Sequence, residues 1–285
     1  MNNTSTIQSD DLSISDLLSG DLKLTTPPNL YFELQKAMER PTYRLDDVAF
    51  IIEKDPALSL RLLKIVNSAY YGFPSQITNI SQAISVIGMT DIQNLVLAAV
   101  VIDKFTELPG GVISMHDFWA KSLRCALIAR DLNAYLKIQP TDATFICGLL
   151  HNIGQLVFYR RIPELARMVV LEQKDFSDDE EVRIEESVIG FNHYEVGATL
   201  TELWKLPNTI TETIRLHTQP MFDSPIQKMA TLIRTANNYA QINMADCNSD
   251  TNSLDLPIEI VRQVMEQSCE EFELIFKIFY PAAKS

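Results

Sequence analysis

Apolar residues recur at helical spacing through most of the chain, whereas the strict alternation of apolar and polar residues that marks a half-buried strand is rare. Asp55-Pro56 has the form of an N-cap followed by proline in the first helical turn, and apolar residues follow it at helical spacing. Capping-box spacing predicts further helix starts at Thr90, Asn192 and Thr209. The pattern therefore predicts an all-α fold.

Longer helical patterns and the breaks between them divide the chain. Helices are predicted over residues 116–136, 141–159, 162–173, 193–205, 209–218, 225–243 and 257–280. Proline and a glycine pair make ELPGGVIS, residues 107–114, the strongest internal break. We expect a flexible leader over residues 1–21 with a short helix near Ile14–Leu18, a first helical lobe over 22–108 and a second lobe over 112–285. The last helix has one apolar face, which we expect to dock on the domain or, failing that, to form a dimer surface.

Composition narrows the class of protein. The 285 residues carry a net charge of -13, and such a surface does not favour nucleic acid, whose phosphates bind clustered Lys and Arg. The longest apolar run, residues 95–102, is too short to cross a bilayer, and no basic residue precedes Lys23, as a signal peptide would require. The four cysteines show no paired spacing. We expect a cytoplasmic protein that binds neither nucleic acid nor membrane.

The densest run of charge is DFSDDEEVRIEE, residues 175–186, with seven acids and one arginine. Acidic side chains are favourable near the amino end of a helix because they face the positive end of its dipole. The segment is therefore predicted to be a solvated loop or helix start, and no chemistry is assigned to it.

The candidate chemistry lies in the histidines, which number four: His116, His151, His193 and His217. His151 lies among apolar residues in LLHNIGQL, His193 opens one predicted helix and His217 closes another. Metal-assisted phosphoester hydrolysis needs neutral imidazoles together with carboxylates that offset the charge of the ion. An isolated histidine in such a place is more often a hydrogen-bonded core or cap residue than a ligand.

Several motifs occur in an order that resembles a known family. The amino half carries DPALSLRLLKIVNSAYYG and then AISVIGMTDIQNLVL, and the second half carries FWAKSL, FICGLLHNIGQLVF, HYEVGATLTELWKLPNTI and IRLH. From about residue 27 to 240 the chain is similar to the HDOD family, the output-domain relatives of the HD and HD-GYP metal-dependent phosphohydrolases. The resemblance implies a two-lobed helical fold whose second lobe is HD-like.

The resemblance also carries the HD metal site onto this chain, residue by residue. The positions that correspond to the metal-site residues are Lys121, His151, Asn152, His193, His217 and Asn237. Lysine thus stands in place of one histidine, and asparagine stands in place of both aspartates. Because the amide of asparagine is neutral and a protonated lysine cannot bind a metal, the site is expected to be degenerate, with no catalytic residue and no metal cofactor.

Alternatives remain at these positions. Lys121 is read as a solvent-facing residue, or as one that fills the vacated metal position through hydrogen bonds, in preference to a third reading in which it attracts an anion. His151, His193 and His217 could instead hold one divalent ion, since zinc accepts three imidazoles and a water. A divergent mononuclear phosphohydrolase is therefore the alternative function. Nucleotide sensing without turnover is a further class, and it would need a pocket around Lys121.

The function that the resemblance implies is regulatory. Family members of this kind are bacterial signalling modules that act by binding other proteins, so a protein partner and a possible homodimer are expected. No receiver, cyclase or kinase segment is recognisable in the chain, which suggests a free-standing module. Function nevertheless depends on the site and not on the fold.

Overall fold

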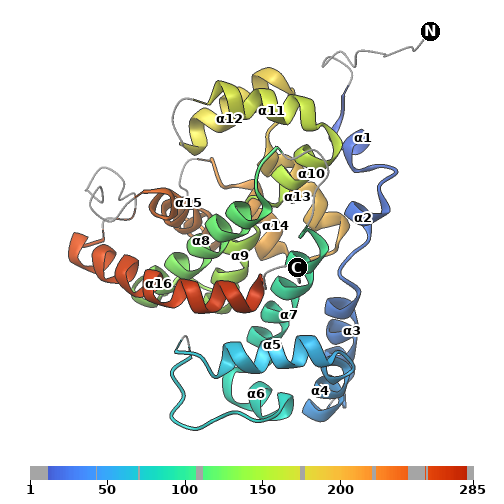
Figure 1. Ribbon diagram of the computed structural model, residues 1–285, viewed down its shortest axis with the longest axis vertical. Coiled ribbons are helices and arrows are strands. Elements are labelled where there is room, and N and C mark those ends of the chain that lie inside the picture. Colours follow the sequence, from blue (N-terminus) through green and yellow to red (C-terminus); the bar gives the residue numbers. More distant parts are fainter. Residues whose placement is uncertain are drawn as a thin grey trace.

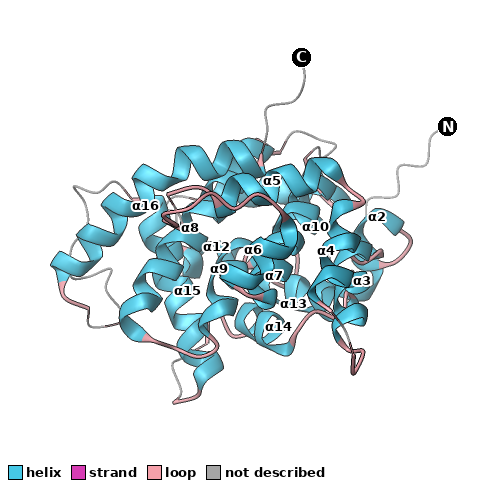
Figure 2. Ribbon diagram, turned by 90° about the horizontal axis from the view of Figure 1, so that it is seen from below, coloured by secondary structure: helices cyan, strands magenta, loops and turns pink. Residues whose placement is uncertain are grey.

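The computed structural model describes residues 12–42, 44–69, 71–106, 112–173, 177–219, 223–242, 254 and 256–280, and the regular elements in these ranges are all helices (Figures 1 and 2). This confirms the all-α prediction. The first helices are α1 (Ile14–Leu18), α2 (Leu22–Thr25), α3 (Asn29–Met38), α4 (Leu45–Glu53), α5 (Pro56–Val66), α6 (Ile80–Ile87) and α7 (Met89–Lys104). The later ones are α8 (Met115–Leu136), the 3-10 turn η2 (Thr141–Ala143), α9 (Thr144–Leu150), α10 (Ile153–Arg161), α11 (Pro163–Glu172), α12 (Asp178–Val188), α13 (His193–Leu203), α14 (Asn208–Arg215), α15 (Pro225–Gln241) and α16 (Ile258–Phe279).

Two of the predicted helix starts are confirmed and two are wrong. The Asp55 side chain accepts from two backbone amides of α5, and Asn192 forms a full capping box at the start of α13. The expected box at Thr90 is absent because α7 already begins at Met89, after a glycine with positive φ. The expected box at Thr209 is absent for a similar reason, since α14 begins one residue earlier and follows a proline. Local backbone direction, set by glycine and proline, overrides the spacing signal at both places.

The predicted flexible leader is wrong from residue 12 onward. Helix α1 forms where it was expected, but it packs against α10 and α13, and its Leu17 and Leu18 are buried. Arg161 donates from Nε to the Leu17 carbonyl oxygen at 2.8 Å, and Arg160 forms an ion pair with Asp21. Arg161 is thus attracted to the negative carboxyl end of α1, and Arg160 is attracted to the carboxylate of Asp21. Residues 1–11 lie outside the described part of the chain.

Helix α8 lies at the centre of the second half and contacts α9, α15 and α16 (Figure 1). The apolar face of α16 is buried, as predicted, and the helix lies beside α5 and α7 of the first half (Figures 1 and 2). Because α7 also packs on α9, contacts cross the expected boundary near residue 110. The division into lobes at 22–108 and 112–285 therefore stays a prediction.

No single helix in the described ranges is both long and apolar enough to cross a membrane. Among the described helices, α6 and α7 taken together are long and apolar enough to cross a membrane, but the chain bends by 118° at the break between them. In the structure α7 is a core helix with buried residues along most of its length.

The helix predicted over residues 141–159 is broken at its centre. Helix α9 ends at Leu150, and α10 begins at Ile153 after a turn formed by His151 and Asn152. Two glycines, Gly154 on α10 and Gly197 on α13, lie at the crossing of those helices, where the backbones touch. The break and the close crossing together direct His151 and Asn152 into the interior beside α13.

Replacing Gly154 with alanine should destabilise the fold. An added β-carbon would overlap the carbonyl oxygen of His193 and lie 2.7 Å from the backbone nitrogen of Gly197, so both helices would have to separate. Overpacking of this kind costs about 2–3 kcal/mol of unfolding free energy. Urea unfolding measures the loss, and Ser187→Ala, at an exposed position of α12, is the control. Equal stability of the two variants would contradict the close crossing.

Candidate functional site

The structure buries five of the six predicted site residues. His151, His193 and His217 are at most 1% exposed, and Asn152 and Asn237 are at most 2% exposed. They come from the α9–α10 turn, the first residue of α13, the turn after α14, and α15. The rings of His151 and His217 stack with 5.4 Å between centroids, and the ring of Tyr194 stacks on His217 at 4.3 Å. The sixth residue, Lys121 on α8, is half-buried.

A carboxylate that sequence reasoning missed connects two of these positions. Asp178, the first residue of α12, accepts from His217 Nε2 at 3.0 Å and from Asn237 Nδ2 at 2.7 Å. Burial disfavours the ionised carboxyl, but the hydrogen bond from His217, together with the positive charge of Lys121, outweighs burial and lowers the pKa of Asp178 below its usual range. Asp178 is therefore an ionised group inside the protein, held by two donors.

Glu185, two turns further along α12, engages His193 in the same way. Its Oε2 accepts from the His193 backbone nitrogen at 2.9 Å and from Nδ1 at 2.8 Å. Burial lowers the pKa of His193, but the charge of Glu185 outweighs burial and raises it above the usual value. A protonated His193 can also donate from Nε2 to Asn152 Oδ1, which lies 3.2 Å away.

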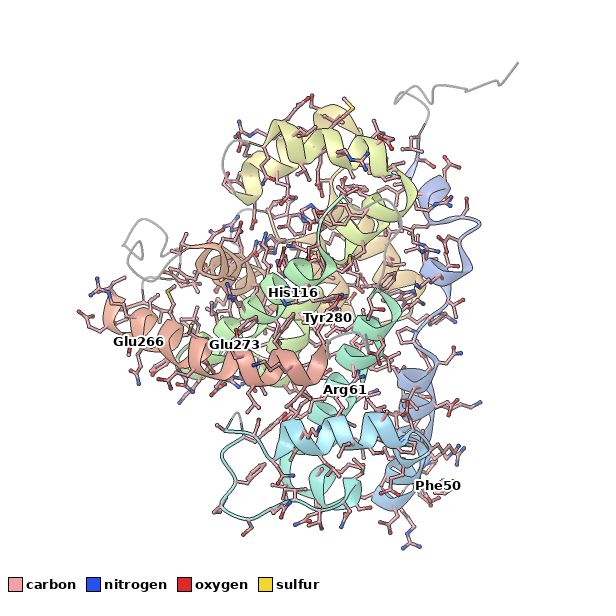
Figure 3. The ribbon with its side chains drawn as sticks, in the orientation of Figure 1. Phe50, Arg61, His116, Glu266, Glu273 and Tyr280 are labelled. Carbon is pink, nitrogen blue, oxygen red and sulfur yellow. The ribbon has the colours of Figure 1, made fainter. Side chains whose placement is uncertain are left out.

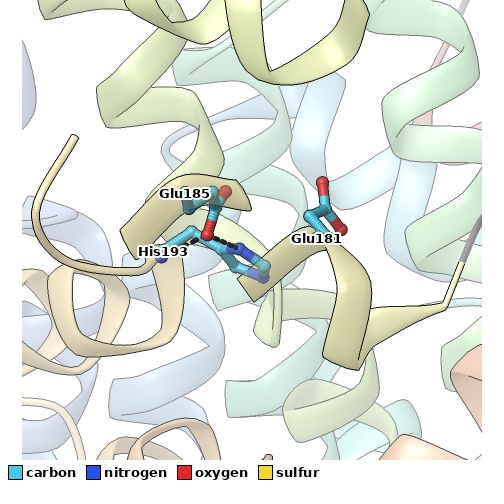
Figure 4. A group of neighbouring side chains, drawn as sticks. All are labelled: Glu181, Glu185 and His193. Carbon is cyan, nitrogen blue, oxygen red and sulfur yellow. Dashed lines mark hydrogen bonds and ion pairs between the residues drawn. The ribbon is translucent and has the colours of Figure 1, made fainter. Parts of the chain in front are cut away.

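A third acid of α12, Glu181, lies on the same side of the helix. Gln155 Nε2 donates to its Oε1 at 2.7 Å, and burial raises the pKa of Glu181. Among the residues that the structure describes, one group could hold a metal ion: Glu181, Glu185 and His193, whose ligand atoms lie within 4.8 Å of one another (Figure 4). This group shares only His193 with the three histidines that the sequence suggested as ligands.

His151 differs from the other two histidines because no carboxylate contacts it. Its Nδ1 lies 2.7 Å from the Gly148 carbonyl oxygen, which accepts only, so Nδ1 carries the proton and Nε2 holds a lone pair. No described residue hydrogen-bonds that Nε2 atom. Burial, with the nearby charges of His217 and Lys121, lowers the pKa of His151 to about 3. His151 is therefore a neutral imidazole with an unused lone pair.

The predicted helix start in residues 175–186 is confirmed, because α12 begins at Asp178 with four acids in its first turn, but the prediction that these acids are solvated is wrong for some of them. Asp178 and Glu185 are buried and Glu181 is half-buried, whereas Asp179 and Glu186 are exposed as expected. The high density of acids made the whole segment look solvated, although only some of its acids face solvent. The missed signal is periodicity: the three inward acids share one helical face with the buried Val182.

Lys121 does not match either of its preferred readings. It is half-buried and lines a groove, so it is not simply a solvated residue. If Lys121 filled a vacated metal position, its ammonium group would form hydrogen bonds there. It forms no hydrogen bond or ion pair with the described residues. Its positive charge nevertheless acts on the buried centre. It contributes to the low pKa of His151, and it partly opposes the rise in the pKa of Glu181 that burial causes.

The fold and this buried histidine–carboxylate centre define a helical protein related to the HD phosphohydrolases, and comparison with known proteins identifies the branch. The family model for the HDOD domain matches residues 24–220. The chain therefore belongs to the HDOD family, as its motifs indicated.

Individual relatives are more distant. An uncharacterised protein of Treponema pallidum is 32% identical over 196 residues, which make up 67% of this chain and 36% of that protein. The chain thus spans about a third of the length of that curated relative.

Two solved structures share the fold. One, a phosphohydrolase candidate from Shewanella amazonensis, has a TM-score of 0.73 at 22% identity, with 97% of this chain and 100% of that chain covered. The other, a candidate signal transduction protein from Marinobacter aquaeolei, has a TM-score of 0.65 at 21% identity, with 88% and 58% covered. Because the two descriptions differ and the identities are low, the likeness shows the fold alone.

Two neighbouring acids of α12 test the buried network. Asp178→Ala should lower the unfolding free energy by about 3 kcal/mol, because His217 and Asn237 lose a shared buried acceptor. Asp179→Ala removes the same charge from an exposed position and should change it by less than about 0.5 kcal/mol. Chemical denaturation of both variants at neutral pH makes the comparison. Similar losses would show that Asp178 has no special role.

The pH dependence of stability tests the state of His151. Its pKa is about 3 when folded and about 6.5 when unfolded, so between these values only the unfolded chain binds the proton. The contribution of His151 is complete above pH 6.5 and is lost as pH falls towards 3. His151→Leu cannot titrate and should lose about 2 kcal/mol less than the wild type between pH 7 and pH 5. His116→Leu, on the surface, is the control, and an unchanged pH profile in His151→Leu would contradict the buried neutral imidazole.

Proposed function

We propose that this protein is a non-catalytic regulatory module that acts by binding other proteins in a bacterial signalling pathway, with a degenerate HD site and no metal cofactor. One observation carries the proposal: Asp178 and Glu185 of α12 are inserted into the histidine centre and bond the imidazoles themselves. Each of these two rings is thereby held by a protein carboxylate at one nitrogen, and the second nitrogen of His193 faces the neutral amide of Asn152.

The substituted positions support the same conclusion. Asn237 donates to Asp178 at 2.7 Å, which an ionised aspartate at position 237 could not do, because two carboxylates at that distance repel each other. Asn152 accepts from His193 but has only one neutral oxygen to offer a metal. The donor set is therefore a poor fit for a two-metal centre.

Burial is a further argument against turnover at this centre. A phosphoester must bring its phosphorus atom to the metal or to the attacking water, so a hydrolytic site needs access from solvent. The three imidazoles are at most 1% exposed. Two acid–imidazole pairs that are closed away from water favour a structural role.

An exposed apolar groove elsewhere on the protein supports the binding of a protein partner. A groove of about 740 Å³ lies between α5 and α16, and Leu60 and Leu274 line it with 55% and 48% of their surface exposed. Phe50, at the far end of the first half, is also 65% exposed (Figure 3). Apolar side chains that share one exposed groove are typical of interaction surfaces.

A mononuclear phosphohydrolase is the second candidate. The group formed by Glu181, Glu185 and His193 favours it, because two carboxylates and an imidazole suit a divalent ion. The description of the Shewanella amazonensis protein as a phosphohydrolase candidate points the same way. In this reading Glu185 would leave His193 Nδ1 to bind the ion.

Metal content separates the two candidates. The purified chain, incubated with zinc, manganese, iron or nickel and then desalted, should hold far less than one ion per molecule, and it should not hydrolyse p-nitrophenyl phosphate or its bis-ester. One ion per chain that is lost in Glu181→Gln, together with hydrolysis, would overturn the proposal in favour of the enzyme.

Complementation of a deletion strain tests the regulatory role in the cell. His151→Gln should restore the phenotype, because a binding module does not need that lone pair. Leu60→Asp should fail, because it places a charge in the apolar groove. Leu171→Asp, at a position 78% exposed on α11, is the matched control and should restore the phenotype. Loss of function in His151→Gln with normal folding would count against the proposal.

A further inference from the structure

A second groove, distinct from the buried histidine centre, lies between α8 and α16. Its volume is about 460 Å³, within the range of roughly 300–1,000 Å³ that is usual for sites that bind small molecules. Helix α8 contributes His116, Lys121 and Arg124, and α16 contributes an aromatic series. Figure 3 shows His116 close to Tyr280 at the end of α16, with Glu273 further along the same helix.

The wall formed by α16 is aromatic. Phe272 and Phe276 stack with 5.2 Å between ring centroids, and Phe276 and Tyr280 stack at 5.5 Å. The His116 ring meets this column edge-on, 4.9 Å from Phe276 and 6.0 Å from Tyr280. The two phenylalanines are buried, whereas His116 is 62% exposed and Tyr280 is half-buried. His116 therefore offers ring surface to a ligand.

The wall formed by α8 is cationic. Lys121 and Arg124 are three residues apart and lie on the same side of the helix. Neither forms an ion pair with a carboxylate in the described ranges, whereas Arg61, Arg130 and Arg160 all do. Arg124 instead lies over the Phe272 ring, 4.5 Å from its centroid.

The acids at the rim do not neutralise these two cations. Asp117 bonds His116 at 3.1 Å, and Glu273 pairs with Lys277 at 3.5 Å. Lys121 and Arg124 therefore form no ion pair with the two acids at the rim of the groove. Such a pair of cations is suited to phosphate, which guanidinium and ammonium groups bind through charge-assisted hydrogen bonds.

We propose that this groove binds a nucleoside phosphate. The phosphate pairs with Lys121 and Arg124, and the base stacks on the exposed His116 ring, which places it edge-on to Tyr280 because those two rings are nearly perpendicular. The ligand is bound and not converted, so the inference goes beyond the regulatory role proposed above and supplies a chemical input to it. Lys121 connects the two sites, because it lines the groove while its charge also reaches His151 and Glu181.

Isothermal titration calorimetry on the full chain tests this inference, with adenosine and guanosine 5′-triphosphates and monophosphates as probes. At least one nucleotide should bind, and its nucleoside and inorganic phosphate should each bind at least about tenfold more weakly. Lys121→Gln and Arg124→Gln should each weaken nucleotide binding by about tenfold or more, because each removes a charged donor to the phosphate. Lys36→Gln, an exposed charge change on α3, should have no effect.

His116→Ala separates ring recognition from charge. It should weaken binding of the nucleotide and leave the weak binding of inorganic phosphate unchanged, while the thermal unfolding midpoint confirms that all variants are folded. The inference is overturned if no probe binds at millimolar concentration, if Lys121→Gln and Arg124→Gln bind as the wild type does, or if inorganic phosphate binds as tightly as the nucleotide.

Discussion

The pairing of two buried carboxylates with buried imidazoles is the constraint on which the rest of the second half depends. Asp178 and Glu185 lie on one helix, and an unpaired charge in the interior would cost several kcal/mol of stability. Each is satisfied by side chains from other elements: His217 and Asn237 for the first, His193 for the second. The network therefore fixes α12 against α13, α15 and the turn after α14.

This pairing also explains the use of two amides in the centre. Asn237 donates to Asp178, where an aspartate would repel it, and Asn152 accepts from a protonated His193. His151 is not paired with a carboxylate, and it keeps a neutral ring with a free lone pair on Nε2.

The backbone makes the arrangement possible. The chain breaks between α9 and α10, and the glycine contact between Gly154 and Gly197 lets α10 approach α13 closely. Asn152 consequently reaches His193 from the opposite side to Glu185. Lys121 of α8 lines a groove that α16 completes, and its charge also acts on the buried centre.

Local signals in the sequence determined the helical class, the start of α5 at Asp55, the capping box at Asn192 and, through its motifs, the HDOD family. These features depend on residues only a few positions apart, or on motifs of fixed order. Only the tertiary structure decided which acids of α12 point inward, since Asp178 finds its donors 39 and 59 residues away. It likewise decided that Arg124 lies over the ring of Phe272, which comes much later in the chain. Periodicity predicts a face of a helix, but the groups that this face meets are set by packing.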